Sequence, residues 1–437
     1  MAQHPFLKSI RPVNLLSFGP NTGEIELRPL NILIGPNGCG KSNLIEIVGL
    51  LSKLPDRDPW STVIQTGGAP EWIWKGRRAH GDLSSLAVEA AGALYPMANN
   101  LGGPLRRAAG HRQEGLKSPY DPPDILKFQE KRVSYNIELR DKDNAFEVVT
   151  ERFQELDRWK DDPVQTPWFE RTGWNGIIHG AKSEMKSPGE YPNLAPNVSV
   201  LSVPRGAAYI LPQVPKIQDF AEQVERFAVY RDWVFGSGSQ IRDVQPVGLD
   251  SYRLAGDSIN LAQVLKAWRD RGNQAVFDHL LELLQKFYEP VKDVDVELVG
   301  THLRIMVKED ALSSRTPATR LSDGTLRWLM LLVILLDPAP PPVICIDEPE
   351  LGLHPDILPT LADLLVDAST RTQLIVTTHS RSFIDSFTDT PEAVCVCEKV
   401  EGSTVIRRLE KDRLKDWLEE YSLGKIWTRG EIGGNRW

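Results

Sequence analysis

The sequence of 437 residues predicts an α/β protein built around a mostly parallel sheet. Two observations support this fold class. A glycine-rich loop at residues 35–42 stands between an apolar strand and a helix, and the last third of the chain alternates apolar strands with helices. Such alternation is typical of parallel sheets that helices cover on both faces. The middle of the chain predicts an inserted helical or mixed lobe without a long coiled coil, because no heptad pattern persists for three or four repeats.

The first elements follow from the residues on either side of the glycine-rich loop. Ile25 and Leu27 alternate with charged residues as in a half-buried strand, and the apolar run 30–34 stops at Gly35. After the loop, residues 42–54 carry a broad apolar face, which predicts a helix. The start of the chain is therefore predicted as strand, loop and helix.

The middle of the chain is less regular. Proline, glycine and asparagine accumulate at residues 101–123 and 161–205, which predicts long loops or partner surfaces. Elsewhere in this region the patterns predict two strands, at residues 133–139 and 146–153. They then predict three helices, at residues 217–233, 259–268 and 274–288.

The last third becomes regular again. Apolar alternation at residues 294–298 and 303–307 predicts a hairpin. After it we expect a helix at residues 325–336 and a strand at 343–346. A second helix at 357–366 and a second strand at 374–377 follow.

Composition limits the class of protein. The net charge of -8 argues against non-specific binding of nucleic acid by the whole surface, although a local basic patch would be compatible with it. The longest aliphatic run, residues 329–336, is much shorter than the roughly 20 residues of a bilayer span, so no membrane partner is expected. The first residues lack the features of an export signal, and the expected compartment is the cytoplasm.

The four cysteines, Cys39, Cys345, Cys395 and Cys397, form no CxxC pair. They therefore suggest neither a zinc knuckle nor a disulfide framework. Cys395 and Cys397 lie in an apolar alternation, which favours a strand core over a metal site.

A phosphate-binding loop is the most specific motif. Residues 35–42 fit the pattern G-x-x-x-x-G-K-[ST] between a predicted strand and a predicted helix. Glycines allow backbone N–H groups to turn toward phosphates, and the start of the helix adds its positive dipole end. Lys41 can reach the outer phosphates and the Ser42 hydroxyl can bind Mg²⁺. The residues predicted to bind the nucleotide here are Asn37, Gly38, Cys39, Gly40, Lys41 and Ser42.

Two acids end an apolar strand further along the chain. Asp347 and Glu348 follow residues 343–346, which places them at the carboxyl edge of the predicted sheet, where ligands of open α/β sheets bind. A solvated strand end would explain the two acids alone, but the upstream phosphate loop favours a catalytic role. We therefore expect Asp347 to hold the metal and Glu348 to act as general base.

A second anion site is predicted where residues 321–325 precede an apolar helix. Ser322 is a good N-cap, and the amides that follow it can face an anion. Alone this is an ordinary helix start.

These motifs resemble those of ABC-type ATPases. The phosphate loop, a Leu-Ser-x-Gly sequence at 321–324, the acidic strand end, a Leu-x-x-His-Pro turn at 351–355 and a histidine at a strand end occur in that family's order. Within the family, the chain resembles the branch of the RecF and SMC proteins and the stand-alone AAA-family ATPases related to OLD nucleases, of the kind found in bacterial defence systems. The resemblance covers about residues 7–54 and 303–387 well and the middle loosely.

The resemblance implies a role for each motif. It implies a head-to-tail homodimer, or a higher assembly, that hydrolyses ATP with Mg²⁺ at shared sites. Ser322 and Gly324 would contact the γ-phosphate held by the opposite subunit, and His379 would be the switch histidine. His354 either orients the turn at the dimer contact or stacks on Pro355. The glutamine loop of the family has no assigned position, because Gln65 and Gln113 lie in poorly patterned sequence.

The expected domain division follows the same resemblance. The two halves of an ATPase head would be residues 1–60 and 301–400. The inserted lobe between them would be residues 61–300, and the tail would be residues 401–437. The tail is too apolar to be a solvated one, and it either docks on its own head or binds a partner subunit.

Two biological functions are compatible with these motifs. The favoured one is an ATP-gated sensor or scaffold in a bacterial anti-phage defence or toxin–antitoxin-like complex with a separate effector subunit. The alternative is a RecF-like, ATP-driven clamp on DNA in repair. For the clamp, the basic runs 75–78 and 106–107 would neutralise phosphates, although short runs of this kind are more often solvated surface.

Overall fold

The computed structural model describes residues 6–77, 81–91, 132–156, 167–179, 189–192, 194–202, 215–231, 233–236 and 238–434. A six-stranded central sheet has the order β10-β15-β16-β3-β17-β18. The first five strands run parallel and β18 pairs antiparallel with β17. In that order, the strands are Ala228–Tyr230, Val343–Asp347, Gln373–Thr377, Leu30–Ile34, Val394–Val400 and Ser403–Arg408.

The register of the central sheet brings its functional segments to one edge. Asp347 lies opposite Thr377, and Thr377 lies opposite Leu33. The loop after β3, the acids after β15 and the residues after β16 therefore all leave the carboxyl ends of neighbouring parallel strands, where open α/β sheets bind ligands.

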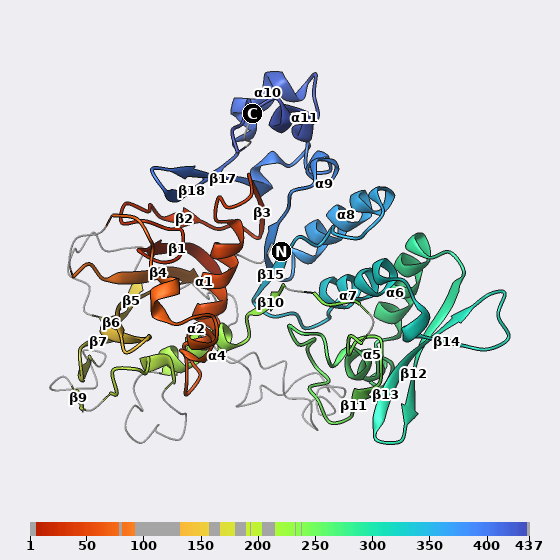
Figure 1. Cartoon of the computed structure of the whole chain (residues 1–437), viewed down its shortest axis with the longest axis horizontal. Helices are drawn as coiled ribbons and strands as arrows, with labels where there is room; N and C mark the ends of the chain where they lie inside the picture. Colours follow the sequence, from red (N-terminus) through yellow and green to blue (C-terminus); the bar gives the residue numbers. More distant parts are fainter. Residues whose placement is uncertain are drawn as a thin grey trace, which may run out of the picture.

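Helices cover both faces of this sheet. The side chains of Leu33, Cys345 and Ile375 pack in one apolar cluster with helix α1 (Lys41–Lys53). Their neighbours along the same strands, such as Ile346, pack in a second cluster with α7 (Asp323–Leu335) and α8 (Leu358–Ala368). Because side chains alternate between the two faces of a strand, α1 and α7 lie on opposite faces (Figure 1).

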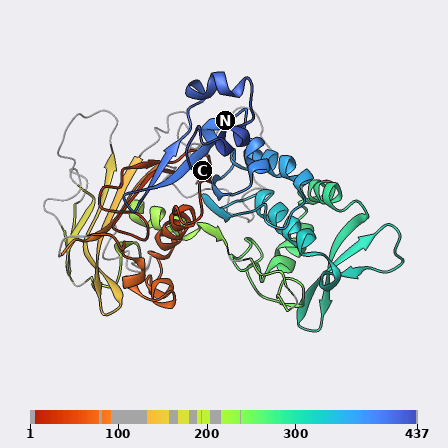
Figure 2. The same ribbon diagram turned by 45° about the horizontal axis from the view of Figure 1, so that its top comes forward.

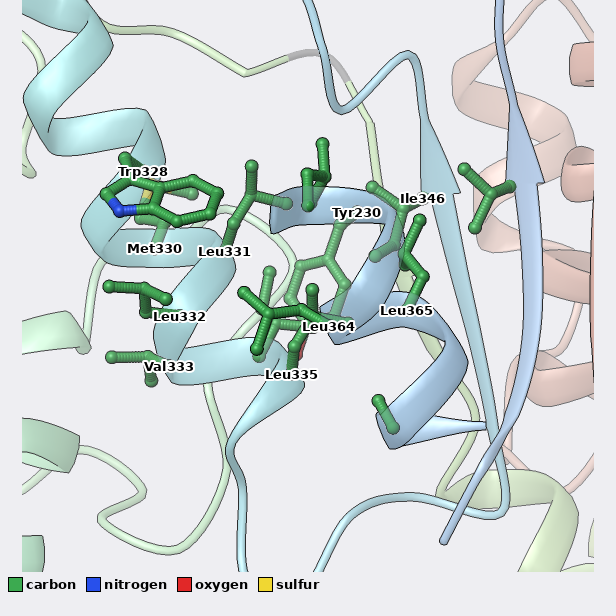
Figure 3. Close-up of a cluster of buried hydrophobic side chains, with 14 of the residues drawn as sticks. Tyr230, Trp328, Met330, Leu331, Leu332, Val333, Leu335, Ile346, Leu364 and Leu365 are labelled. Atoms are coloured by element: carbon green, nitrogen blue, oxygen red, sulfur yellow. The ribbon is translucent and has the colours of Figure 1, made fainter. Parts of the chain in front are cut away.

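Helix α7 has apolar side chains on nearly every side, so other elements must cover it almost completely. Figure 3 shows Leu331 and Leu335 of α7 on the side toward Leu364 of α8 and Tyr230 of the sheet, while Leu365 of α8 lies beside Ile346. Trp328 is fully buried, and its Nε1 donates a hydrogen bond to the carbonyl of Leu283 at 2.9 Å. This packing fixes the position of the helix that Ser322 caps.

The largest sheet is antiparallel, with eight strands in the order β2-β1-β4-β5-β6-β7-β8-β9. The two strands expected at residues 133–139 and 146–153 are present as β5 and β6, and the structure shows that they pair antiparallel. In sheet order, the strands are Ile25–Glu26, Leu7–Val13, Ser84–Ala91, Arg132–Lys142, Ala145–Leu156, Phe169–Thr172, Asn175–Ile178 and Gly189–Pro192.

A third, four-stranded antiparallel sheet pairs β13 with β11, β12 and β14 and carries helices α5 and α6. Figure 2 shows it and the eight-stranded sheet at opposite ends of the molecule. The hairpin expected at residues 294–307 is confirmed as β12 and β13. The elements here are β11 Gln245–Pro246, β12 Val291–Val299, β13 His302–Glu309, β14 Thr316–Pro317, α5 Leu261–Asp270 and α6 Gln274–Phe287.

The remaining described helices are short. They are α2 Ser61–Gln65, α3 Ala69–Trp72, α4 Pro215–Glu225, α9 Arg381–Asp385, α10 Lys411–Leu418 and α11 Leu423–Thr428, with 3₁₀ turns at Val200–Ser202, Ala318–Arg320, Pro355–Ile357 and Pro391–Ala393. Among the described residues, none of the helices is both long and apolar enough to cross a membrane.

The α/β class is confirmed, but three expectations need correction. A mostly parallel sheet is not confirmed for the chain as a whole, because the other two sheets are antiparallel throughout. The helix expected at 217–233 ends at Glu225, and Ala228–Tyr230 instead forms β10, which pairs in parallel with β15. The stretch 161–205 contains β7, β8 and β9 within its described parts. These strands are only four residues long and depend on their neighbours in the sheet. The loop expected at 101–123 lies outside the described residues.

Candidate nucleotide-binding site

The phosphate loop joins β3 to α1 in a conformation that requires glycine. Gly38 and Gly40 have positive φ angles of 76° and 107°. A Cβ on Gly40 would lie 2.1 Å from Thr404 Oγ1 and 2.4 Å from Ser17 Oγ. The loop therefore passes too close to its neighbours for any side chain at this position.

Lys41 is the first residue of α1 and is only 4% exposed. Its Nζ donates hydrogen bonds to the carbonyls of Gly35 at 2.9 Å and Pro36 at 3.2 Å, so the ammonium group lies inside the curve of the loop. The first turn of α1 has no acidic residue and no side-chain cap. Backbone N–H groups, a helix N-terminus and a buried cation together suit a phosphate group.

Oxygen groups suited to a metal lie beside the loop. Ser42 Oγ donates a hydrogen bond to Asp347 Oδ1 at 3.2 Å, and Thr377 Oγ1 donates to the same oxygen. Hydroxyl and carboxylate oxygens are ligands that Mg²⁺ accepts. No group of three or more His, Cys, Asp and Glu side chains suited to a metal occurs in the described part of the chain. This small ligand set fits Mg²⁺, which usually takes one or two carboxylates and completes its shell with water and phosphate oxygens.

Glu348 and His379 lie together at the same edge. The backbone of Glu348 has a φ of 48°, and its N–H donates to Thr377 Oγ1 at 3.1 Å. Its Oε1 lies 3.2 Å from Nε2 of His379. Burial, and then the charge of Asp347, raise the pKa of Glu348. Burial, and then the charge of Lys41, lower the pKa of His379, which favours a neutral imidazole that can donate to the carboxylate.

The Leu-Ser-x-Gly segment begins α7 on the opposite face of the sheet from α1. Ser322 is exposed, and its Oγ accepts a hydrogen bond from the N–H of Thr325 at 3.0 Å. A Cβ on Gly324 would lie 2.9 Å from the carbonyl of Gly352 and 3.2 Å from Phe287, so the segment packs closely on the turn after β15. Of the predicted site residues, Ser322 and Gly324 thus form a second group, apart from the one around Lys41.

Comparisons with known proteins support the fold. Residues 245–385 match a family model described as "AAA domain, putative AbiEii toxin, Type IV TA system". The crystal structure of an SMC head bound to the C-terminal winged-helix domain of ScpA aligns over 94% of this chain and 100% of its own, at 13% identity and a TM-score of 0.52. The chain has the fold of an SMC-type ATPase head. The resemblance to ABC-type ATPases of the SMC and RecF branch is confirmed at this level.

Two further solved SMC heads align less closely. A head with an extended coiled coil, derived from Pyrococcus furiosus and bound to the C-terminal domain of ScpA, has a TM-score of 0.49 at 12% identity, over 95% of this chain and 99% of its own. The SMC head from Thermotoga maritima has a TM-score of 0.41 at 13% identity, over 93% and 99%. No curated protein matches the sequence.

A cavity of about 440 Å³ adjoins the phosphate loop. Its wall includes Ser17, which contacts the loop, and Asn43 of α1, together with the ring of Trp74. The Nε1 of Trp74 donates to the carbonyl of Gly402 at 3.1 Å, which holds the ring in place. The remaining lining residues are Leu16, Glu71, Ile73, Lys75, Gly76, Lys399 and Gly402. No sequence motif indicates this cavity, because its walls come from distant parts of the chain.

Sequence motifs also missed two polar residues near the candidate site. Glu350 is 7% exposed, and its Oε1 accepts hydrogen bonds from Thr378 Oγ1 and from the N–H of His379, the latter at 3.2 Å. Burial raises the pKa of Glu350. Arg242 donates to the carbonyl of Leu321 at 2.6 Å and pairs with Asp323, so it holds the start of α7. Neither residue lies in a motif that sequence alone would single out.

The structure decides several smaller points. His354 Nδ1 accepts a hydrogen bond from the N–H of Asp356 at 3.3 Å, so it caps the turn before α8. Cys395 and Cys397 are buried in β17 as strand-core residues. Gln65 is exposed on α2, and Gln113 lies outside the described residues.

Proposed function

We propose that this ATPase head binds ATP with Mg²⁺ and hydrolyses it at sites completed by a second copy of the chain. The single observation that carries the proposal is the meeting of the phosphate loop, Asp347, Glu348 and His379 at one edge of the parallel sheet. Residues 37–42 would hold the phosphates, while Ser42 and Asp347 would hold the metal.

The catalytic residues follow from the contacts at this edge. Bound Mg²⁺ would offset the negative charge that phosphoryl transfer moves between oxygens. Glu348 would orient the attacking water and accept its proton, as expected of a carboxylate whose pKa is raised toward neutrality. His379 would keep Glu348 in position through the 3.2 Å contact and face the terminal phosphate.

A head-to-tail dimer is proposed from the position of the second group. Ser322 is exposed at the start of α7, which covers the opposite sheet face from α1. The positive end of α7 would then meet the γ-phosphate bound to another copy, while Gly324 lets this helix start pack against Gly352 of its own chain.

The cavity beside Trp74 is the candidate site for the nucleotide base. It adjoins the loop that would hold the phosphates, and an indole ring suits stacking against a base. Lys75, considered above for DNA binding, lines this cavity and pairs with Glu71 at 3.3 Å. Arg78, Arg106 and Arg107 lie outside the described residues, so no observed contact favours the DNA clamp over the scaffold.

For the biological role we propose an ATP-gated sensor or scaffold with a separate effector subunit in a bacterial defence or toxin–antitoxin-like complex. The support is the family model, whose description names a type IV toxin–antitoxin system. Purification of the tagged chain from its own host would test this role. Recovery of one stoichiometric protein partner would support it, and recovery of DNA alone would favour the clamp.

Substitution of the loop lysine tests ATP binding directly. Lys41→Ala should weaken ATP binding by about 10²-fold, because a buried, charge-assisted contact to phosphate is lost. Isothermal titration with ATP and Mg²⁺ measures this change. The matched control is Lys53→Ala, at the exposed end of the same helix, which should bind ATP like the wild type. Wild-type affinity in Lys41→Ala would contradict the proposed function.

A further inference from the structure

The C-terminal segment returns to the ATPase core after β18. Helix α11 packs on α9, where the N–H of Leu423 donates to Thr388 Oγ1 at 3.1 Å and that of Gly424 to Asp385 Oδ1 at 2.8 Å (Figure 1). A Cβ on Gly424 would lie 2.6 Å from the carbonyl of Arg381, so the two helices touch backbone to backbone. Docking of the tail on its own head is therefore observed for residues up to 434.

After α11, residues 429–434 are held against strand β17 by specific contacts. The N–H of Gly434 donates to Glu398 Oε1 at 2.8 Å, and its carbonyl accepts from Trp427 Nε1 at 3.1 Å. Ile432 is 3% exposed, and its carbonyl accepts from Arg407 at 2.9 Å. Both polar groups of the Gly434 backbone are thus satisfied by side chains of the head and of α11.

The segment fits its site only with glycine at its end. Gly433 and Gly434 have φ angles of 75° and 69°. A Cβ on Gly433 would lie 2.5 Å from Glu398 Oε1, and one on Gly434 would lie 2.6 Å from Cγ1 of Val396. The same Cβ on Gly434 would lie 3.6 Å from the Cα of Gly35, the first residue of the phosphate loop.

Gly35 links this segment to the nucleotide site. On one side, a Cβ on Gly35 would lie 2.2 Å from the carbonyl of Cys397, so β17 leaves it no space to move. Val396 pairs in register with Ile34, directly before the loop. On the other side, the Gly35 carbonyl accepts the hydrogen bond from Lys41 Nζ. A displacement of residues 429–434 would therefore change the position of Gly35 and, through its carbonyl, that of Lys41.

We propose that residues 429–434 position the phosphate loop, with Glu398 as the positioning residue, so that ATP affinity depends on the docked segment. By thermodynamic linkage, bound ATP then stabilises the docking to the same extent. This inference rests on the proposed ATP site. It adds that residues 429–434 dock more stably when that site is filled.

Removal of the Glu398 contact provides the first test. Glu398→Ala leaves the Gly434 N–H without its acceptor and should raise the Kd for ATP by about 5-fold or more, the lower end of ordinary coupling between sites. Glu398→Gln retains an acceptor oxygen and should restore most of the affinity. The control is Glu410→Ala, at the exposed start of α10 in the same C-terminal region. Titration calorimetry measures all three variants, with melting temperatures confirming that each is folded.

Hydrogen exchange of the full-length wild-type chain provides the second test. ATP with Mg²⁺ should slow exchange of the amides of Gly433 and Gly434, and the Lys41→Ala variant should show no such slowing. Wild-type ATP affinity in folded Glu398→Ala, or unchanged exchange of these amides at saturating ATP, would overturn the inference. Absence of ATP binding by the wild type would instead reject the proposed function itself, so the two failures are distinguishable.

Discussion

The two groups of the candidate site differ in how far one chain completes them. Around the phosphate loop, Lys41 is 4% exposed, and Asp347 accepts hydrogen bonds from Ser42 and Thr377 of the same chain. At the start of α7, Ser322 is exposed, and the side chain of Asp323 is 63% exposed. The proposed binding and catalytic groups are thus assembled within one chain, whereas the proposed anion-binding helix start faces outward. Under the proposed function, nucleotide binding and completion of the site would be separable events.

The strongest effect should come from the group that one chain completes. Glu348→Gln should slow ATP turnover by about 10²-fold or more, the scale of a lost general base, while ATP affinity is kept. Phosphate release measures the rate, and Asp56→Asn, beyond the end of α1, is the control. Because burial raises the pKa of Glu348, the acidic limb of the wild-type rate profile should lie above the ordinary glutamate value of about 4.3. An undiminished rate in the Gln variant would place the base elsewhere.

A smaller effect is expected from the contact that holds Glu348. His379→Ala removes the neutral donor beside Glu348 Oε1 and should lower turnover by about tenfold, the scale of one hydrogen bond. The Kd for ATP should stay close to that of the wild type. The same phosphate-release assay, with binding measured separately, checks both statements. A loss of ATP affinity without a change in turnover would assign His379 to binding rather than to catalysis.

The third effect concerns stability rather than turnover. Glu350→Ala leaves the buried hydroxyl of Thr378 and the N–H of His379 without their acceptor and should cost about 1–3 kcal/mol of unfolding free energy. Glu350→Gln keeps an acceptor and should cost less. Urea unfolding of both variants measures the difference. Equal costs for the two variants would show that these hydrogen bonds contribute little.

The pH dependence of Glu350 has a definite sign. Burial raises its pKa in the folded state above the unfolded value, so the folded state binds the proton more tightly. Its contribution to stability is therefore largest at low pH and is lost as the pH rises from about 4.3 through the folded pKa. Since Gln does not ionise, the stability of Glu350→Gln relative to the wild type should rise over that interval. A relative stability that falls instead would contradict the assigned direction.

The sequence predicted those parts of the site that form within a short segment of the chain. The spacing of Gly35, Gly40 and Lys41 requires a tight turn into a helix, and an apolar strand places Asp347 at its end wherever the sheet lies. The strand β10 could not be predicted, because three residues acquire their conformation only by pairing with β15. Glu350 and the cavity beside Trp74 depend on contacts between distant segments. The hydrophobic periodicity of a segment does not indicate which distant segment it will contact.

Completion of the site across two chains is best tested by Ser322→Arg. The measurement is light scattering with ATP and Mg²⁺ in the Glu348→Gln background, with ATP affinity determined in parallel. We expect wild-type ATP affinity through Lys41 but no ATP-dependent dimer, because the Arg fills the space before α7. The control Thr370→Arg lies at the amino-terminal edge of the sheet, before β16, and should dimerise normally. Normal dimerisation of Ser322→Arg, or loss of its ATP binding, would contradict the composite site.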